Sequence, residues 1–190
     1  MNIKLLKELC ALQATSGDEA GMKNFILDYV KTHSGSWKVE PTILEGDHFQ
    51  DNLILIFGSP TLAFYSHMDS VGFTVRYQNQ LVPIGSPEPE SGDMLVGEDS
   101  MGPIECALRV EKKGNVFHEF GRTIKPGTPL TYKPDFRQNG DTITSSYLDN
   151  RVGIFSLLEL AVTLENGALV FSTYEEHGGG SAGYLGKYLH

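Results

Sequence analysis

The chain has 190 residues, of which 40% are hydrophobic, and it carries a formal net charge of -9 with a pI near 5.1. This length supports one core, or one domain with a sizeable insertion. The acidic balance argues against a nucleic-acid partner or an anionic membrane surface. The cysteines, Cys10 and Cys106, match no metal-ligand spacing, so we interpret them as buried reduced thiols. With no secretory signal at the start and no apolar stretch near the roughly twenty residues of a membrane span, we expect a cytoplasmic protein.

The first third of the sequence predicts helices followed by strands. Apolar spacing favours helices over residues 3–12 and 19–31, and Ser16 with Glu19 has the spacing of a capping box. Strands are expected over 37–44, 52–57 and 62–66. This order indicates an α/β layer architecture.

Residues 71–140 have a different character, because short alternating apolar runs replace the helical spacing and Gly and Pro separate them. This pattern predicts a small β-rich module inserted into the chain. After the module we expect a strand over 168–174 and a last helix near 181–190. Between them and the module, a helix over 150–164 is expected to bury Val152, Ile154, Phe155, Leu158 and Leu160.

Three groups of polar residues lie where an apolar run ends or a helix begins. His67 and Asp69 follow one strand, Asp149 opens the helix, and Glu175 and Glu176 follow the last strand. We expect these groups to gather at the carboxyl ends of parallel strands. An imidazole with several carboxylates suits Zn, Co or Mn better than a thiolate site would. An Asp can bridge two ions, and of two adjacent Glu residues one can bind metal while the other acts as a base.

The chain resembles the glutamyl and deblocking aminopeptidases, which are cytoplasmic dinuclear metallopeptidases also called cellulase-M-like. The motifs that carry the resemblance are His67-Met68-Asp69-Ser70-Val71-Gly72-Phe73, Tyr147-Leu148-Asp149-Asn150-Arg151-Val152-Gly153 and Glu175-Glu176-His177-Gly178. Residues 14–19 and 51–54 also look like this family. The resemblance runs from about residue 3 to the end, and the motifs together are quite specific.

The resemblance implies two divalent metal ions, Zn or Co, with Mn as a further option. His67 and Glu176 would bind metal, Asp149 would bridge both ions, Glu175 would be the general base and Asp69 would support His67. The implied fold is α/β: a three-layer zinc-peptidase-like sheet with helices on both faces, plus an inserted small β-barrel-like domain. Residues 1–70 and 141–190 would form the catalytic domain, and residues 71–140 the inserted dimerisation domain.

The implied activity is removal of amino-terminal residues from peptides by a metal-activated water, in a homo-oligomer that binds neither nucleic acid nor membrane. The family also uses an Asp about twenty residues past the Glu pair and a His far downstream, and neither position falls within these 190 residues. We therefore expect a form truncated at its C-terminus that can be inactive alone. The sequence can be part of a longer polypeptide, or a neighbouring chain can supply the rest.

Two other functions stay open at this point. The chain can be a non-catalytic fragment or relative that acts in oligomerisation or binding, although such a protein has no need of an intact set of ligands and base. Carbohydrate hydrolysis by two carboxylates is a second enzymatic alternative, but it leaves His67 and Asp149 without a role.

Overall fold

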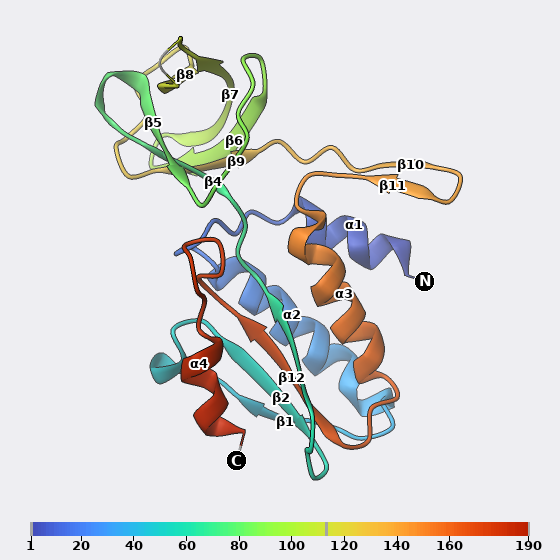
Figure 1. Ribbon diagram of the computed structural model, residues 1–190. Helices are drawn as coiled ribbons and strands as arrows, with labels where there is room; N and C mark the ends of the chain where they lie inside the picture. The colour runs from blue at the N-terminus through green and yellow to red at the C-terminus, as the bar shows by residue number, and fades with distance from the viewer. Residues whose placement is uncertain (1, 113, 190) are drawn as a thin grey trace.

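The computed structural model describes residues 2–112 and 114–189 and shows an α/β body from which a β-barrel branches (Figure 1). The strands of the body are β1 (Thr42–Leu44), β2 (Leu53–Phe57), β3 (Ala63–His67) and β12 (Gly167–Ser172). Its helices are α1 (Ile3–Ala11), α2 (Ala20–His33), α3 (Leu148–Ala161) and α4 (Ala182–Leu185), with 3₁₀ turns at Ser34–Ser36, Asp47–Phe49 and Gly186–Tyr188.

The sheet of the body has the strand order β1-β2-β12-β3. Strand β12 is buried along its whole length and pairs antiparallel with β2 and parallel with β3. Because successive strand residues face opposite sides, Leu169 and Phe171 pack with the core of α1, α2 and α3. Ala168 and Val170 pack on the other face, with Leu185 of α4. The sheet thus lies between helices on both faces, and the predicted three-layer α/β fold is confirmed.

The inserted module is a closed barrel with the strand order β4-β5-β8-β7-β6-β9. Every neighbouring strand pair is antiparallel, and apolar side chains such as Phe73, Leu95 and Leu108 fill the interior. Gly97 is required where β6 meets β9, because a Cβ there would lie 2.6 Å from the Pro129 carbonyl oxygen. The strands are β4 (Gly72–Val75), β5 (Gln80–Ile84), β6 (Met94–Asp99), β7 (Gly102–Val110), β8 (Val116–Glu119) and β9 (Pro129–Tyr132), with a 3₁₀ turn at Tyr77–Asn79.

A hairpin of β10 (Arg137–Asn139) and β11 (Thr142–Thr144) follows the barrel and leads back to α3 (Figure 1). The segment just before α3 contacts the barrel, because the Tyr147 hydroxyl accepts a hydrogen bond from the backbone N–H of Tyr132 at the end of β9. The predicted β-barrel-like insertion is therefore present between β3 and α3.

Two expectations about strands need correction. The expected strand over 37–44 pairs with β2 over Thr42–Leu44, since the backbone N–H of Lys38 instead donates to the Val162 carbonyl and Pro41 has no N–H to donate. Strand β3 is parallel to β12, as expected, but only its last residues, Ser66 and His67, are buried. It lies at the edge of the described sheet, so Phe64 and Tyr65 remain 39% and 41% exposed.

The helices differ from expectation in which residues they bury. Val152 is 43% exposed, because α3 turns Arg151, Ile154, Phe155 and Leu158 inward at helical spacing. The expected last helix is shorter: α4 ends at Leu185 and a 3₁₀ turn follows, while His190 lies outside the described residues. Across residues 2–112 and 114–189, no helix combines the length and the apolar character that crossing a membrane requires.

Candidate metal centre

Strands β3 and β12 bring two of the sequence motifs together. They pair in parallel with Ser172 opposite His67, so both carboxyl ends point to the same edge of the body. The Met68 N–H donates to the Ser172 carbonyl at 2.7 Å and extends this pairing past the last ladder residue. His67 ends β3, and the Glu175–Glu176 pair follows the end of β12 after two residues.

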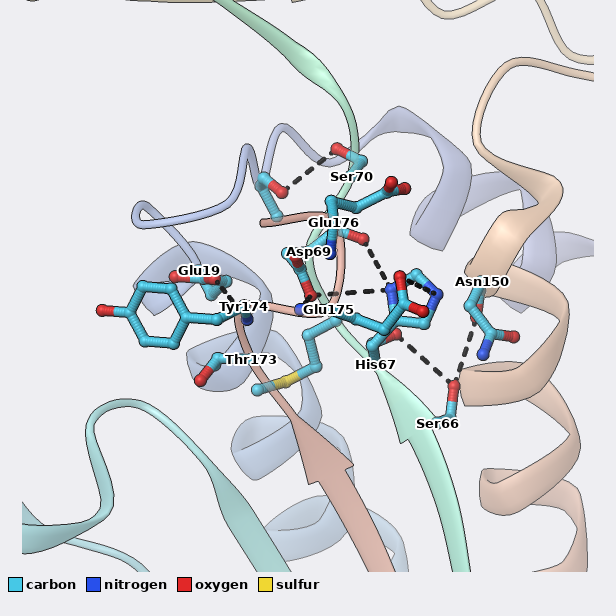
Figure 2. Close-up of polar contacts among 12 residues, drawn as sticks. Glu19, Ser66, His67, Asp69, Ser70, Asn150, Thr173, Tyr174, Glu175 and Glu176 are labelled. Carbon is cyan, nitrogen blue, oxygen red and sulfur yellow. Dashed lines mark hydrogen bonds and ion pairs between the residues drawn. The ribbon is translucent and has the colours of Figure 1, made fainter. Parts of the chain in front are cut away.

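The third motif reaches the same place through the first turn of α3. The Nε2 atom of His67 lies 3.0 Å from Oδ1 of Asp149. The same nitrogen lies 3.8 Å from Oε2 of Glu175 (Figure 2). One ligand atom each from His67, Glu175 and Glu176 lies within 4.8 Å of the others. The His67 ring is 9% exposed, whereas the side chains of Asp149 and Glu175 are 87% and 57% exposed. A buried imidazole thus meets carboxylates that are open to solvent on one side.

Asp69 holds the backbone around this cluster. Its side chain has no exposed surface, and its two oxygens accept hydrogen bonds from the backbone N–H groups of Glu175, at 3.2 Å, and Glu176, at 3.0 Å. The Nδ1 atom of His67 donates to the backbone carbonyl of Asp69 at 3.1 Å, and the Asp69 carboxylate lies 3.5 Å from the same nitrogen. The residue therefore contacts both the imidazole and the segment that carries the two glutamates.

The carboxylates shift the acidity of the site. Burial of the ring lowers the pKa of His67, but neighbouring carboxylates, chiefly Asp69, outweigh this and raise the pKa to about 9. Burial raises the pKa of Asp69, but hydrogen bonds from His67 and from the Glu176 N–H hold it below its usual range. Desolvation raises the pKa of Glu176, which lies among these like charges. The cluster carries a surplus of negative charge that a bound cation would offset.

The residues present fit a divalent metal. Ligand atoms of His67, Glu175 and Glu176 lie within 4.8 Å of one another, Asp149 lies 3.0 Å from the imidazole, and the free side of the cluster is open. Nitrogen and oxygen donors of this kind suit Zn, Co or Mn. The hydrogen bond from Nδ1 to Asp69 leaves Nε2 as the nitrogen that faces the carboxylates.

Arg151 is a residue of this region to which the sequence assigned no role. Its side chain is fully buried and donates hydrogen bonds to the backbone carbonyls of Met68 and, at 3.4 Å, Leu12. Burial lowers the pKa of the guanidinium to about 10, while the charges of Asp69 and Glu176 act in the opposite direction. The sequence could have indicated this burial, because Arg151 lies at helical spacing from the apolar residues at positions 154, 155 and 158 of α3.

The expected capping box of Ser16 and Glu19 is not formed. Helix α2 begins at Ala20, and Glu19 at its N-cap makes no side-chain capping hydrogen bond. Its carboxylate turns inward and is 1% exposed, and Oε1 accepts hydrogen bonds from the backbone N–H groups of Gly17 and Tyr174. Glu19 therefore joins the start of α2 to the segment just before Glu175.

The body thus carries a His–carboxylate cluster at the ends of two parallel strands, and a β-barrel is inserted between His67 and Asp149. A family model for the M42 glutamyl aminopeptidase matches residues 108–189, which include Asp149, Glu175 and Glu176. A comparison with curated protein sequences found no match.

Solved structures share the fold over nearly the whole chain. An aminopeptidase from the archaeon Desulfurococcus kamchatkensis matches with a TM-score of 0.81 and 20% identity, covering 96% of this chain and 59% of that one. The TET1 peptidase of Pyrococcus horikoshii, which can assemble into a tetrahedron or a large octahedral shell, matches with a TM-score of 0.73 and 20% identity. This match covers 93% of this chain and 62% of that one. An endoglucanase from Thermotoga maritima matches with a TM-score of 0.71 and 20% identity, and the match covers 97% of this chain and 62% of that one.

The chain therefore has the fold of the M42 aminopeptidases, and the family resemblance indicated by its sequence is confirmed. It spans about three fifths of the length of these solved structures.

Proposed function

We propose that this chain functions as a metal-dependent aminopeptidase or as part of one, with its metal centre at the ends of β3 and β12. The observation that supports this most is the convergence of His67, Glu175 and Glu176 within 4.8 Å, with Asp149 3.0 Å from the imidazole. In this proposal His67 and Glu176 would bind metal, and Asp149 would be shared between the two ions. Two divalent ions, Zn, Co or Mn, would supply a bound water of lowered pKa and positive charge beside the scissile carbonyl.

Glu175 is the proposed general base. Its side chain is 57% exposed on the open side of the cluster, where it can accept a proton from the attacking water and pass it to the leaving amine. The reaction adds water across the first peptide bond: a C–O bond forms, the C–N bond breaks and the amine leaves protonated. Asp69 positions His67 and the backbone of Glu175 through the hydrogen bonds described above.

The same proposal assigns a division of the chain and an oligomeric state. Residues 1–70 and 141–190 form the catalytic α/β domain, and residues 71–140 form an inserted domain for dimerisation. The TET1 peptidase that shares the fold forms large assemblies, which supports a homo-oligomer. The substrate is a peptide, and we place the protein in the cytoplasm, with no nucleic-acid or membrane partner.

Metal content of a sample whose intact mass matches 190 residues tests the proposal first. Uptake of close to two ions per chain supports it, and absence of uptake favours the alternative of a non-catalytic fragment or relative that acts in oligomerisation or binding. Hydrolysis of short peptides is then compared for the wild type, Glu175→Gln and Glu40→Gln, an exposed control remote from the cluster. Glu175→Gln should lower kcat by about 100- to 10,000-fold with metal content unchanged. Activity that survives this change would remove Glu175 as the base.

A further inference from the structure

The segment that carries both glutamates is held by buried side chains that reach it from three other elements. After Ser172 the sheet ladder ends, yet each of the next four backbone N–H groups has a side-chain acceptor. Figure 2 shows two of these acceptor residues, Glu19 and Asp69, beside the segment. The pairs are Thr173 N with Asn52 Oδ1 at 2.9 Å, Tyr174 N with Glu19 Oε1 at 3.4 Å, Glu175 N with Asp69 Oδ1 at 3.2 Å and Glu176 N with Asp69 Oδ2 at 3.0 Å. We call Asn52, Glu19 and Asp69 the amide clamp.

The clamp sets a backbone conformation that the segment would not adopt by itself. Tyr174 has φ 63°, in the left-handed region, which costs a residue with a Cβ about 1–2 kcal/mol. Such a conformation persists where its surroundings fix it. The three acceptor residues are 0–1% exposed, and a hydrogen bond to a buried acceptor is electrostatically stronger than one in water. The direction in which Glu175 and Glu176 leave the backbone therefore depends on the clamp.

Glu19 is the member of the clamp whose chemistry calls for an explanation. It is 1% exposed, and burial together with the nearby charge of Asp69 raises its pKa. An apolar side chain would fill the same space without the free-energy cost of a buried carboxyl group. What Glu19 offers instead is an acceptor, and Oε1 is already held by the Gly17 N–H at 3.0 Å, so it is fixed where the Tyr174 N–H meets it.

We propose that Glu19 is a positioning residue of the metal centre, which acts through the Tyr174 amide to hold the turn that places Glu175 and Glu176 against His67. The roles of the two glutamates rest on the function proposed above, whereas the hold on the turn can be tested in metal-free protein. The Glu19 carboxylate accepts hydrogen bonds from the Gly17 and Tyr174 N–H groups, so its effect on the site passes through the backbone of residues 174–176.

Amide hydrogen exchange, measured by NMR on the metal-free chain, tests the hold directly. Glu19→Met removes the acceptor at similar volume and should speed exchange at residues 174–176 by about tenfold relative to the core amide of Leu169. Glu19→Gln keeps an oxygen acceptor and should restore wild-type exchange. Leu27→Ala, a core change in α2, serves as the control for general destabilisation. It should not speed amide exchange at residues 174–176 more than it speeds exchange at Leu169.

Cobalt titration of the same variants tests the consequence for the site. Glu19→Met should weaken Co²⁺ binding about 10- to 100-fold, as loss of a group that orients metal ligands does, and Glu19→Gln should bind as the wild type does. Three results would each overturn the proposal. They are unchanged amide exchange at residues 174–176 in Glu19→Met, equal defects in exchange or Co²⁺ affinity in Glu19→Met and Glu19→Gln, and unchanged Co²⁺ affinity in Glu19→Met. A wild type that takes up none of Co²⁺, Zn²⁺ and Mn²⁺ would contradict the proposed function instead, and the exchange rates would still decide whether Glu19 holds the turn.

Discussion

Replacing Asn52 with leucine tests how much the buried polar contacts behind the site contribute to stability. Asn52 is fully buried, and its Oδ1 accepts hydrogen bonds from the Thr173 N–H at 2.9 Å and from the Ser181 hydroxyl. Its Nδ2 donates to the Phe49 carbonyl, which keeps a second bond, at 2.9 Å, from the backbone N–H of Asn52 itself. The group at risk in Asn52→Leu is therefore the Thr173 N–H.

The expected magnitude follows from the acceptor that remains. A buried donor left without a partner costs about 1–3 kcal/mol, but the Thr173 N–H also lies 3.3 Å from Ser181 Oγ. Asn52→Leu alone should thus cost about 1 kcal/mol, or about 2–4 °C in Tm for a chain of this size. Asn52→Leu combined with Ser181→Ala removes both acceptors and should cost about 3 kcal/mol, which exceeds the sum of the single changes.

Urea unfolding followed by circular dichroism measures these differences, with Asn24→Leu as an exposed control expected within about 0.5 kcal/mol of the wild type. Additive single changes would show that Ser181 does not substitute for Asn52. A cost near zero for the double variant would show that the Thr173 N–H needs no acceptor at all.

Further changes probe other parts of the molecule. Gly153→Ala places a Cβ against Asn150 Oδ1 and should lower the free energy of unfolding by roughly 1–3 kcal/mol in urea titrations, with weaker Co²⁺ binding because Asn150 adjoins Asp149. Phe171→Ala empties a fully buried position and should cost about 3–5 kcal/mol by the same assay. The Arg122 guanidinium lowers the pKa of Asp99 to about 2, so this pair stabilises the fold above about pH 4 and less as pH falls towards 2. The difference in urea midpoint between wild type and Asp99→Asn should therefore shrink over that range.

The sequence predicted the elements whose signal is local. Apolar runs and the polar residues that end them located β3, β12 and the start of α3, and the Gly- and Pro-rich stretch after His67 located the barrel. The polar residues that follow each strand are visible in the sequence. Because neighbouring parallel strands have their carboxyl ends at the same edge of the sheet, those residues were expected to lie close together. These patterns were sufficient for the fold class and for bringing His67, Asp149 and Glu175 to one place.

The residues that sequence analysis placed wrongly depend on partners far along the chain. Glu19 matches a capping box with Ser16, but its acceptor is used by Tyr174, 155 positions later, and no local pattern contains that partner. Helix α3 is apolar on several sides, so its inward face cannot be chosen from periodicity, and the structure turns Arg151 inward in place of Val152. The exposure of β3 depends on the strand order of the sheet, which local patterns do not state.

Hydrogen bonding separates the carboxylates of this region into two kinds that residue type alone does not distinguish. The oxygens of Asp69 both accept backbone N–H groups, and Oε1 of Glu19 accepts two, in positions with almost no exposure. A carboxylate whose lone pairs are occupied in this way, and which is closed to solvent, is poorly placed to bind a metal. Asp149 and Glu175 lie on the open side, and Glu176 contributes an oxygen to the cluster around His67. The buried pair thus contacts the backbone, and the remaining carboxylates are those to which the proposed function assigns metal binding and proton transfer.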